Sequence, residues 1–213
     1  MIRTKALRYQ YDMAHTFDFP DIKCEAKETL LITGNSGVGK TTLLHLLAGI
    51  IRPVSGEILI NNQNISNLSK KALDKFRGNN IGLILQQAHF VEALTVIENL
   101  ELASWLAKGS KNTAKALDLL NELEISEHKN KMTYQLSVGQ QQRLSIARAL
   151  MANPKVLLAD EPTSNLDDEN TALVSNLLVH LASFHEVALV VVTHDYRLKN
   201  SSLNHVNLTN HVV

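Results

Sequence analysis

The segment from Gly34 to Thr42 reads G-N-S-G-V-G-K-T-T and contains the G-x-x-x-x-G-K-T pattern of loops that bind phosphate. Its glycines can adopt the positive φ angles that turn backbone N–H groups toward an anion. A following helix adds unpaired N–H groups and its positive dipole end. Lys40 would then reach the β- and γ-phosphates of a nucleotide, and the Thr41 hydroxyl would bind magnesium. The alternative is a glycine-rich turn with an incidental lysine.

Polar residues also stand where three uncharged runs of the sequence end. Asp160 and Glu161 follow residues 156–159, His194 comes shortly after residues 187–192, and Gln86 follows residues 81–85. In open α/β sheets, ligands bind at the carboxyl ends of the strands, so we expect these side chains at one edge. Because side chains alternate along a strand, Asp160 and Glu161 should face different ways, one toward magnesium and one toward an attacking water. A solvated acidic turn is the alternative for this pair.

Three further features have both a functional and a structural interpretation. Tyr9 and Tyr11 share one face of an expected strand, where either ring could stack on a base or pack as an ordinary strand aromatic. Ser137 and Gln140 fit a capping box, which indicates either a well-capped helix or, with the glycine between them, a second anion site. Asp167 could simply cap the helix that follows it.

The spacing of apolar residues predicts the strands and helices that must position these groups. Strands are expected at residues 7–11, 28–33, 57–60, 81–85, 156–159 and 187–192, and helices at residues 42–49, 69–76, 96–108, 112–124, 138–151 and 168–184. The periodicity between residues 94 and 151 is helical throughout, which indicates an inserted helical lobe in an α/β protein. The segment after Lys199 is short and polar.

Composition narrows the class of protein. The 213 residues include 21 basic and 21 acidic side chains, which argues against a nucleic-acid surface that covers the whole protein. The single cysteine, Cys24, cannot form an internal disulfide, suits a reducing cytosol and is expected to be buried. Neither a run of about twenty apolar residues nor a secretory signal is present, so we expect a cytoplasmic protein.

The order of these motifs resembles the ATP-binding cassette (ABC) ATPases over nearly the whole chain. The most telling part is residues 136–143, L-S-V-G-Q-Q-Q-R, which look like the L-S-G-G-Q signature of that family and its continuation. The resemblance implies a P-loop NTPase of the α/β class, with a RecA-like mixed sheet core flanked by helices, an antiparallel β edge and an inserted helical subdomain. It implies a single nucleotide-binding domain, 1–213, with a core lobe of residues 1–87 and 152–213 and a helical subdomain of residues 88–151.

The resemblance also assigns roles to individual positions. It implies ATP and Mg²⁺ as cofactors. Catalytic roles fall on Glu161, which polarises the attacking water, and on His194, Lys40 and Gln86. The implied magnesium ligands are Thr41, Gln86 and Asp160. Nucleotide contacts fall on Tyr11 (Tyr9 stays possible), Asn35, Ser36, Gly37, Val38, Gly39, Lys40, Thr41, Thr42, Ser137, Gly139, Gln140 and Asp167.

In this family two cassettes bind head to tail, so the signature of one copy closes over ATP held by the other, and Asp167 matches a residue that crosses that interface. A second copy of this chain and an integral-membrane permease are the implied partners, with no nucleic acid. The chain would then lie on the cytoplasmic face of the inner membrane. Val138 departs from the family because it stands where the first signature glycine is usual, and we expect a functional but slower ATPase.

Residues 94–100, residues 68–82 and the lack of a C-terminal domain look similar to the lipoprotein-releasing, macrolide-export and cell-division group, whose permeases are FtsX-like. The alternative function is a soluble ABC ATPase acting on nucleic acid or the ribosome. Such relatives usually carry two cassettes or long insertions. A small-molecule kinase would leave residues 136–143 unexplained.

Overall fold

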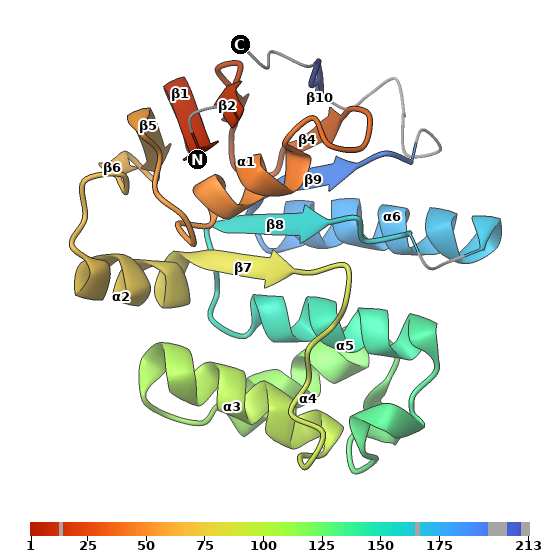
Figure 1. The fold of residues 1–213 in the computed structure, drawn as a ribbon. Helices are drawn as coiled ribbons and strands as arrows, with labels where there is room; N and C mark the ends of the chain where they lie inside the picture. The colour runs from red at the N-terminus through yellow and green to blue at the C-terminus, as the bar shows by residue number, and fades with distance from the viewer. Residues whose placement is uncertain (13–14, 165–166, 196–203, 210–213) are drawn as a thin grey trace.

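A five-stranded parallel sheet forms the centre of the computed structural model, which describes residues 1–12, 15–164, 167–195 and 204–209 (Figure 1). The strand order is β10-β4-β9-β8-β7. All neighbours pair in parallel, so the carboxyl ends of these strands lie at one edge. The strands are β4 (Thr29–Thr33), β7 (Ile81–Ile84), β8 (Val156–Asp160), β9 (Ala188–Thr193) and β10 (Asn204–Asn207).

A second, antiparallel sheet lies beside the first. In it, β1 pairs with β2, β3 and β5, and β5 also pairs with β6. These strands are β1 (Ile2–Asp12), β2 (His15–Asp18), β3 (Lys23–Cys24), β5 (Ser55–Ile60) and β6 (Gln63–Asn64). The expected α/β fold with an antiparallel edge is confirmed, with the parallel and antiparallel strands of the described residues in two separate sheets.

The core divides into two clusters because the parallel strands are buried on both faces. Along β4, Leu31 belongs to the cluster that includes the helices from α3 (Val96–Lys108) to α6 (Asp168–Phe184). Leu30 and Ile32 belong to the cluster under α1 (Lys40–Leu47) and the antiparallel sheet. The same alternation separates Leu157 from Leu158 on β8. Burial on both faces explains why these strands appear in the sequence as continuous apolar runs.

The described residues form six α-helices. They are α1 (Lys40–Leu47), α2 (Lys70–Asn80), α3 (Val96–Lys108), α4 (Thr113–Glu122), α5 (Val138–Leu150) and α6 (Asp168–Phe184), with short 3₁₀ turns η1 (Ser126–His128) and η2 (Thr133–Gln135). The helices α3, α4 and α5 gather at one end of the molecule (Figure 1). The bounds expected for residues 96–108 and 168–184 match α3 and α6. The division into a core lobe and a helical subdomain stays a prediction.

Two differences from the expected elements have local reasons. The first helix begins at Lys40 rather than Thr42, since Gly39 takes a left-handed φ of 93° and ends the loop there. The strand β10 was missed because Asn204 and Asn207 have poor strand propensity. Its polar side chains are held by the neighbouring strand: Thr33 Oγ1 lies 2.7 Å from His205 Nε2 and donates to Asn207 Oδ1 at 3.2 Å.

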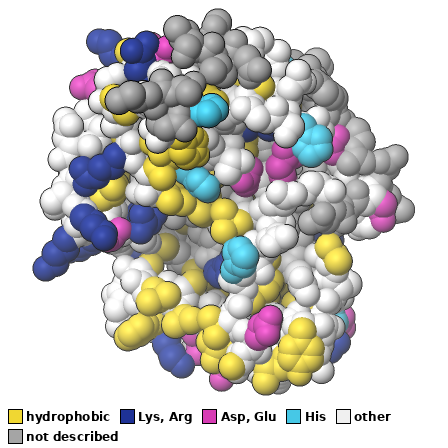
Figure 2. Space-filling view, viewed as in Figure 1, with side chains coloured by type: hydrophobic (Ala, Val, Ile, Leu, Met, Phe, Trp, Pro, Cys, Tyr) yellow, Lys and Arg dark blue, Asp and Glu magenta, His cyan; other side chains and the backbone are white. Residues whose placement is uncertain are grey.

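The surface charge, the helices and the single cysteine can be compared with what the composition led us to expect. Lys and Arg side chains gather on the left of the face in Figure 2, over α2. Among the described residues, no helix combines the length and the hydropathy needed to cross a bilayer.

Cys24 is fully buried as expected, and burial raises the pKa of its thiol to about 12.

Substituting Gly82 tests the packing of α5 on the sheet. A Cβ at Gly82 would lie 2.6 Å from the backbone oxygen of Ala149 on α5, so Gly82→Ala should lower the free energy of unfolding by about 1–3 kcal/mol. The matched control is Gly78→Ala on α2, where the nearest atom lies 3.8 Å away. It should be neutral or stabilise by up to about 1 kcal/mol. Urea unfolding measures both, and equal midpoints would contradict this packing.

Candidate active site

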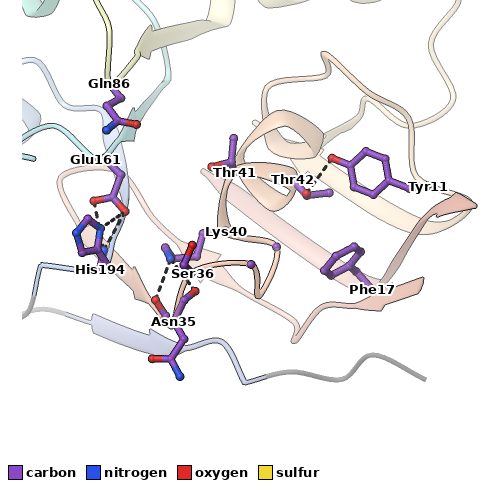
Figure 3. A pocket seen from close by; sticks show the side chains of 13 residues that line it. Tyr11, Phe17, Asn35, Ser36, Lys40, Thr41, Thr42, Gln86, Glu161 and His194 are labelled. Carbon is purple, nitrogen blue, oxygen red and sulfur yellow. Dashed lines mark hydrogen bonds and ion pairs between the residues drawn. The ribbon is translucent and has the colours of Figure 1, made fainter. Parts of the chain in front are cut away.

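A cavity of about 790 Å³ opens at the carboxyl edge of the parallel sheet. Figure 3 shows aromatic rings at one end of this cavity, Gln86, Glu161 and His194 at the other, and the phosphate-binding loop between them. The structure therefore brings together most of the residues expected from the sequence. The lining residues are Tyr11, Phe17, Gly34, Asn35, Ser36, Gly37, Gly39, Lys40, Thr41, Thr42, Gln86, Glu161 and His194.

The loop between β4 and α1 has the geometry of an anion cradle. Gly37 and Gly39 have φ angles of 84° and 93°, which side chains rarely adopt, and a Cβ at Gly39 would lie 2.8 Å from the Phe17 ring. No side chain caps the start of α1. The Lys40 ammonium is buried and donates to the carbonyls of Gly34 at 2.8 Å and Asn35 at 3.0 Å. Phosphate oxygens could replace these carbonyls as its acceptors.

Glu161 directly follows β8 and is held by β9. Its carboxylate accepts from Thr193 Oγ1 at 2.8 Å and from the backbone N–H of His194 at 3.0 Å, and its Oε1 lies 2.7 Å from His194 Nδ1. The φ angle of Glu161 is 46°, an uncommon value for a residue with a side chain. Such strain persists where surrounding contacts enforce it, and it clusters at functional sites.

Asp160 lies behind the cavity wall rather than on it. Its side chain is buried, and burial first, then the charge of Glu161, raises the pKa of this carboxyl. A hydrogen bond from Thr41 and the charges of His45 and Lys40 act in the opposite direction. A hydroxyl and a desolvated carboxylate in contact are oxygen ligands suited to magnesium, whose charge would offset the cost of burying Asp160. The residues present therefore fit this ion.

The aromatic end of the cavity favours Tyr11 over Tyr9 as the base platform. Tyr11 is 58% exposed, lines the cavity and hydrogen-bonds Thr42 Oγ1 through its hydroxyl at 3.1 Å. Tyr9 packs against the core with its ring edge-on to Tyr11 at 4.8 Å. Phe17 on β2 adds a second wall, 6.1 Å from the Tyr11 ring.

The start of α5 lies outside the main cavity but borders a second one. The Ser137 hydroxyl accepts from Gln140 N, and Gln140 Oε1 accepts from Ser137 N, which confirms the capping box. A smaller cavity of about 310 Å³ reaches from Gln86 and Glu161 to Val138, which is 58% exposed. A Cβ at Gly139 would meet no atom within 4 Å. Residues 136–143, called the signature segment below, therefore border open space at Val138 and Gly139.

Asp167 and Val38, two other residues predicted for the site, have side chains with structural roles. Asp167 caps α6, accepting from Asn170 N at 2.8 Å, so the capping interpretation is confirmed. Val38 buries its side chain in the core, where only its backbone is left to serve a ligand. Sequence reasoning missed Phe17 and Thr193. Alternating aromatics at Phe17 and Phe19, and a hydroxyl where β9 ends, were the available signals.

Comparisons with known proteins agree with this geometry. A family model described as ABC transporter matches residues 18–164. "Lipoprotein-releasing system ATP-binding protein LolD 2" of Chlorobium chlorochromatii (strain CaD3) is 43% identical over 79% of this chain and 73% of that protein. "Lipoprotein-releasing system ATP-binding protein LolD" of Buchnera aphidicola subsp. Schizaphis graminum (strain Sg) is 34% identical over 91% of this chain and 86% of that protein.

Solved structures show the same fold. The dimeric structure of a post-hydrolysis state of the ATP-binding cassette MJ0796, bound to ADP and Pi, superposes with a TM-score of 0.86. It is 32% identical, and the match covers 98% of this chain and 94% of that one. The cassette cbiO1 from Clostridium perfringens, part of the cbiONQ transporter complex, has a TM-score of 0.80 and 30% identity over 91% of this chain and 78% of that one.

Substituting the two tyrosines in parallel tests the base platform. Tyr11→Leu should weaken ATP binding about tenfold, since base stacking on an aromatic ring contributes roughly 1–3 kcal/mol. Tyr9→Leu keeps an apolar side chain against the core and should change ATP affinity less than about twofold. Titration with a fluorescent ATP analogue measures both affinities. Equal losses in the two variants would contradict the assignment to Tyr11.

Replacing Asp160 tests its electrostatic cost. The raised pKa means that the folded chain keeps this proton to higher pH than the unfolded chain, so the carboxylate lowers stability as the pH rises through that window. Without magnesium at pH 7, Asp160→Asn should therefore melt roughly 2–4 °C higher, with the gain shrinking toward acid pH. Magnesium with ATP should stabilise the unsubstituted chain more than the variant. Exposed Asp118→Asn is the control, and a lower melting temperature for Asp160→Asn would contradict the argument.

Proposed function

The chain belongs to the ABC transporter family and is an ATP-hydrolysing subunit of a transporter, and from this premise we propose that two copies close head to tail around two ATP molecules. Closure would be driven by ATP and reversed by hydrolysis, and the movement would act on a separate membrane permease. The observation that carries the proposal is the cavity in which the phosphate-binding loop faces Gln86, Glu161 and His194.

Lys40 and the loop amides bind the triphosphate in this scheme. The Lys40 ammonium exchanges its two carbonyl acceptors for β- and γ-phosphate oxygens, which are stronger, charged acceptors. Tyr11 stacks on adenine at the other end of the cavity. Thr41, Asp160 and Gln86 would hold Mg²⁺, which would supply positive charge to neutralise the phosphates. The hydrogen bond that joins Thr41 to Asp160 places two of these oxygen ligands together and supports this assignment.

Glu161 orients the attacking water and accepts its proton. Thr193 and His194 fix the carboxylate through three short contacts, which keeps it from turning toward solvent. Oε1 accepts from the backbone N–H of His194 at 3.0 Å and lies 2.7 Å from His194 Nδ1. Oε2 accepts from Thr193 Oγ1 at 2.8 Å and only weakly from the same N–H at 3.3 Å, so Oε2 has more capacity for a further hydrogen bond from water. His194, 64% exposed at its side chain, is free to reach the γ-phosphate from the same edge.

A second copy completes each site. In one copy Ser137, Gly139 and Gln140 lie outside the main cavity, so they reach a nucleotide only when they belong to the opposite cassette. The open space at Gly139 supports this contact. Asp167 would cross the same interface. The exposed side chain of Val138 would stand against the opposite phosphate, and we infer that it slows closure without preventing it.

The partner in the membrane is inferred from relatives. Two relatives are named as ATP-binding proteins of a lipoprotein-releasing system, and a third is part of a transporter complex. We infer that this chain binds an integral-membrane permease of the FtsX-like type and lies at the cytoplasmic face of the inner membrane. These relatives favour transport over action on nucleic acid or the ribosome.

A hydrolysis-deficient variant tests the head-to-tail mechanism. Glu161→Gln should bind ATP but not cleave it, so ATP stays in place and holds two cassettes together. Sizing with and without ATP and magnesium should show a dimer only with ATP, while the unsubstituted chain turns ATP over and stays mostly monomeric. Lys40→Ala in the same background is the control, and it should lose the dimer because it loses ATP. A Glu161→Gln variant that binds ATP and stays monomeric would contradict the homodimer.

A further inference from the structure

His128 is a buried titratable residue beside the start of α5. It closes the turn η1, and 8% of its surface is exposed. Its Nε2 lies 2.8 Å from the side-chain amide nitrogen of Gln140. Gln140 belongs to the signature segment, whereas His128, among the described residues, neither lines the main cavity nor has a hydrogen bond to a residue that does.

The capping box decides which way the Gln140 amide points. Its Oε1 accepts from the backbone N–H of Ser137 at 3.0 Å, and an N–H cannot accept in return. The amide nitrogen therefore faces His128, and this nitrogen can only donate. His128 Nε2 must be the acceptor, which requires an uncharged ring with its proton on Nδ1. That Nδ1 is buried and has no hydrogen-bond partner among the described residues.

The carboxylate of Glu127 is a second possible partner for the same ring nitrogen of His128. Glu127 Oε1 lies 3.2 Å from His128 Nε2, and a carboxylate can only accept. Protonation turns Nε2 into a donor, so the charged ring repels the amide of Gln140 and bonds the carboxylate of Glu127. One atom thus has two alternative partners, and its protonation selects between them.

Other charged groups around His128 have different contacts. Glu124, before η1, pairs with Arg143 of α5 at 2.9 Å. Glu98, at the start of α3, accepts from Thr95. Lys129 and Lys131 follow His128 in the chain, and among the described residues the carboxylate in contact with the ring is that of Glu127.

We propose that His128 is a positioning residue for the signature segment and makes closure of the two cassettes sensitive to pH. The uncharged ring holds Gln140 and the first turn of α5 in the arrangement that meets the nucleotide of a second copy. When Nε2 is protonated, it donates to Glu127 instead of accepting from Gln140, and Gln140 loses this hydrogen bond. The inference rests on the proposed head-to-tail pairing.

The test measures the ATP-dependent dimer in the Glu161→Gln background between pH 8 and pH 5.5, the range in which imidazoles ordinarily titrate. Sedimentation gives the dissociation constant for this parent and for the parent with His128→Gln or His128→Phe. Glutamine offers an acceptor that does not titrate, and phenylalanine fills the space without one. At pH 8, His128→Phe should weaken the dimer about threefold to tenfold, and His128→Gln should not.

Lowering the pH should weaken the parent dimer more than the His128→Gln dimer, and the difference between them isolates His128 from the other eight of the nine histidines. Glu127→Gln should shift the weakening of the parent dimer to lower pH, because the protonated ring of His128 then lacks the charged acceptor that stabilises it. ATP affinity of each monomer and its melting temperature are the controls for folding, and both should be unchanged.

The outcomes separate this inference from the proposed function. If the parent binds ATP but forms no dimer at any pH, the head-to-tail mechanism fails. If the parent dimerises and the His128→Gln profile follows it at every pH, or His128→Phe dimerises as tightly as the parent, the role of His128 is overturned and the mechanism stands.

Discussion

The parallel pairing of β4, β9 and β8 is the constraint on which the site depends. The register aligns Thr33 with Thr193 and Asp160 with Val192, so the phosphate loop, Asp160 and His194 all leave the sheet at the same level. Parallel strands can only be joined by crossovers, and this order of strands brings segments about 130 residues apart to one edge. The cavity exists because the segments that follow β4, β7, β8 and β9 meet there.

Polar groups in and next to the cavity satisfy one another. Lys40 bonds two loop carbonyls, Glu161 bonds Thr193 and His194, and Asp160 is bonded by Thr41. Buried polar groups are costly without partners, so these contacts stabilise the free protein. A bound nucleotide and its metal ion would have to replace these contacts. Lys40 requires the negative charge of a phosphate, and Asp160 requires the positive charge of a cation.

The last turn of α5 packs directly against the sheet and the segment after β7. Arg148 on α5 donates to the carbonyl of His89 and lies 4.9 Å over the ring of Phe90, so α5 holds the segment that follows Gln86. Gly82 permits α5 to approach β7 at backbone distance. Contacts within one chain therefore join α5, whose first turn carries part of the signature segment, to the residues after Gln86, and Val138 and Gln86 border the same small cavity.

The sequence by itself determined the phosphate loop, the strand ends that carry Gln86, Asp160 and His194, and the long helices α3 and α6, because each depends on local pattern and periodicity. Tertiary structure decided the rest. It separated Tyr11 from Tyr9 by placing one ring in the cavity and the other against the core. It formed β10 from polar residues that only a neighbouring strand could order, and it brought Glu161 onto His194 and Gln140 onto His128. These contacts join residues 12 or more positions apart, and no local pattern encodes which side chain the fold will place beside another.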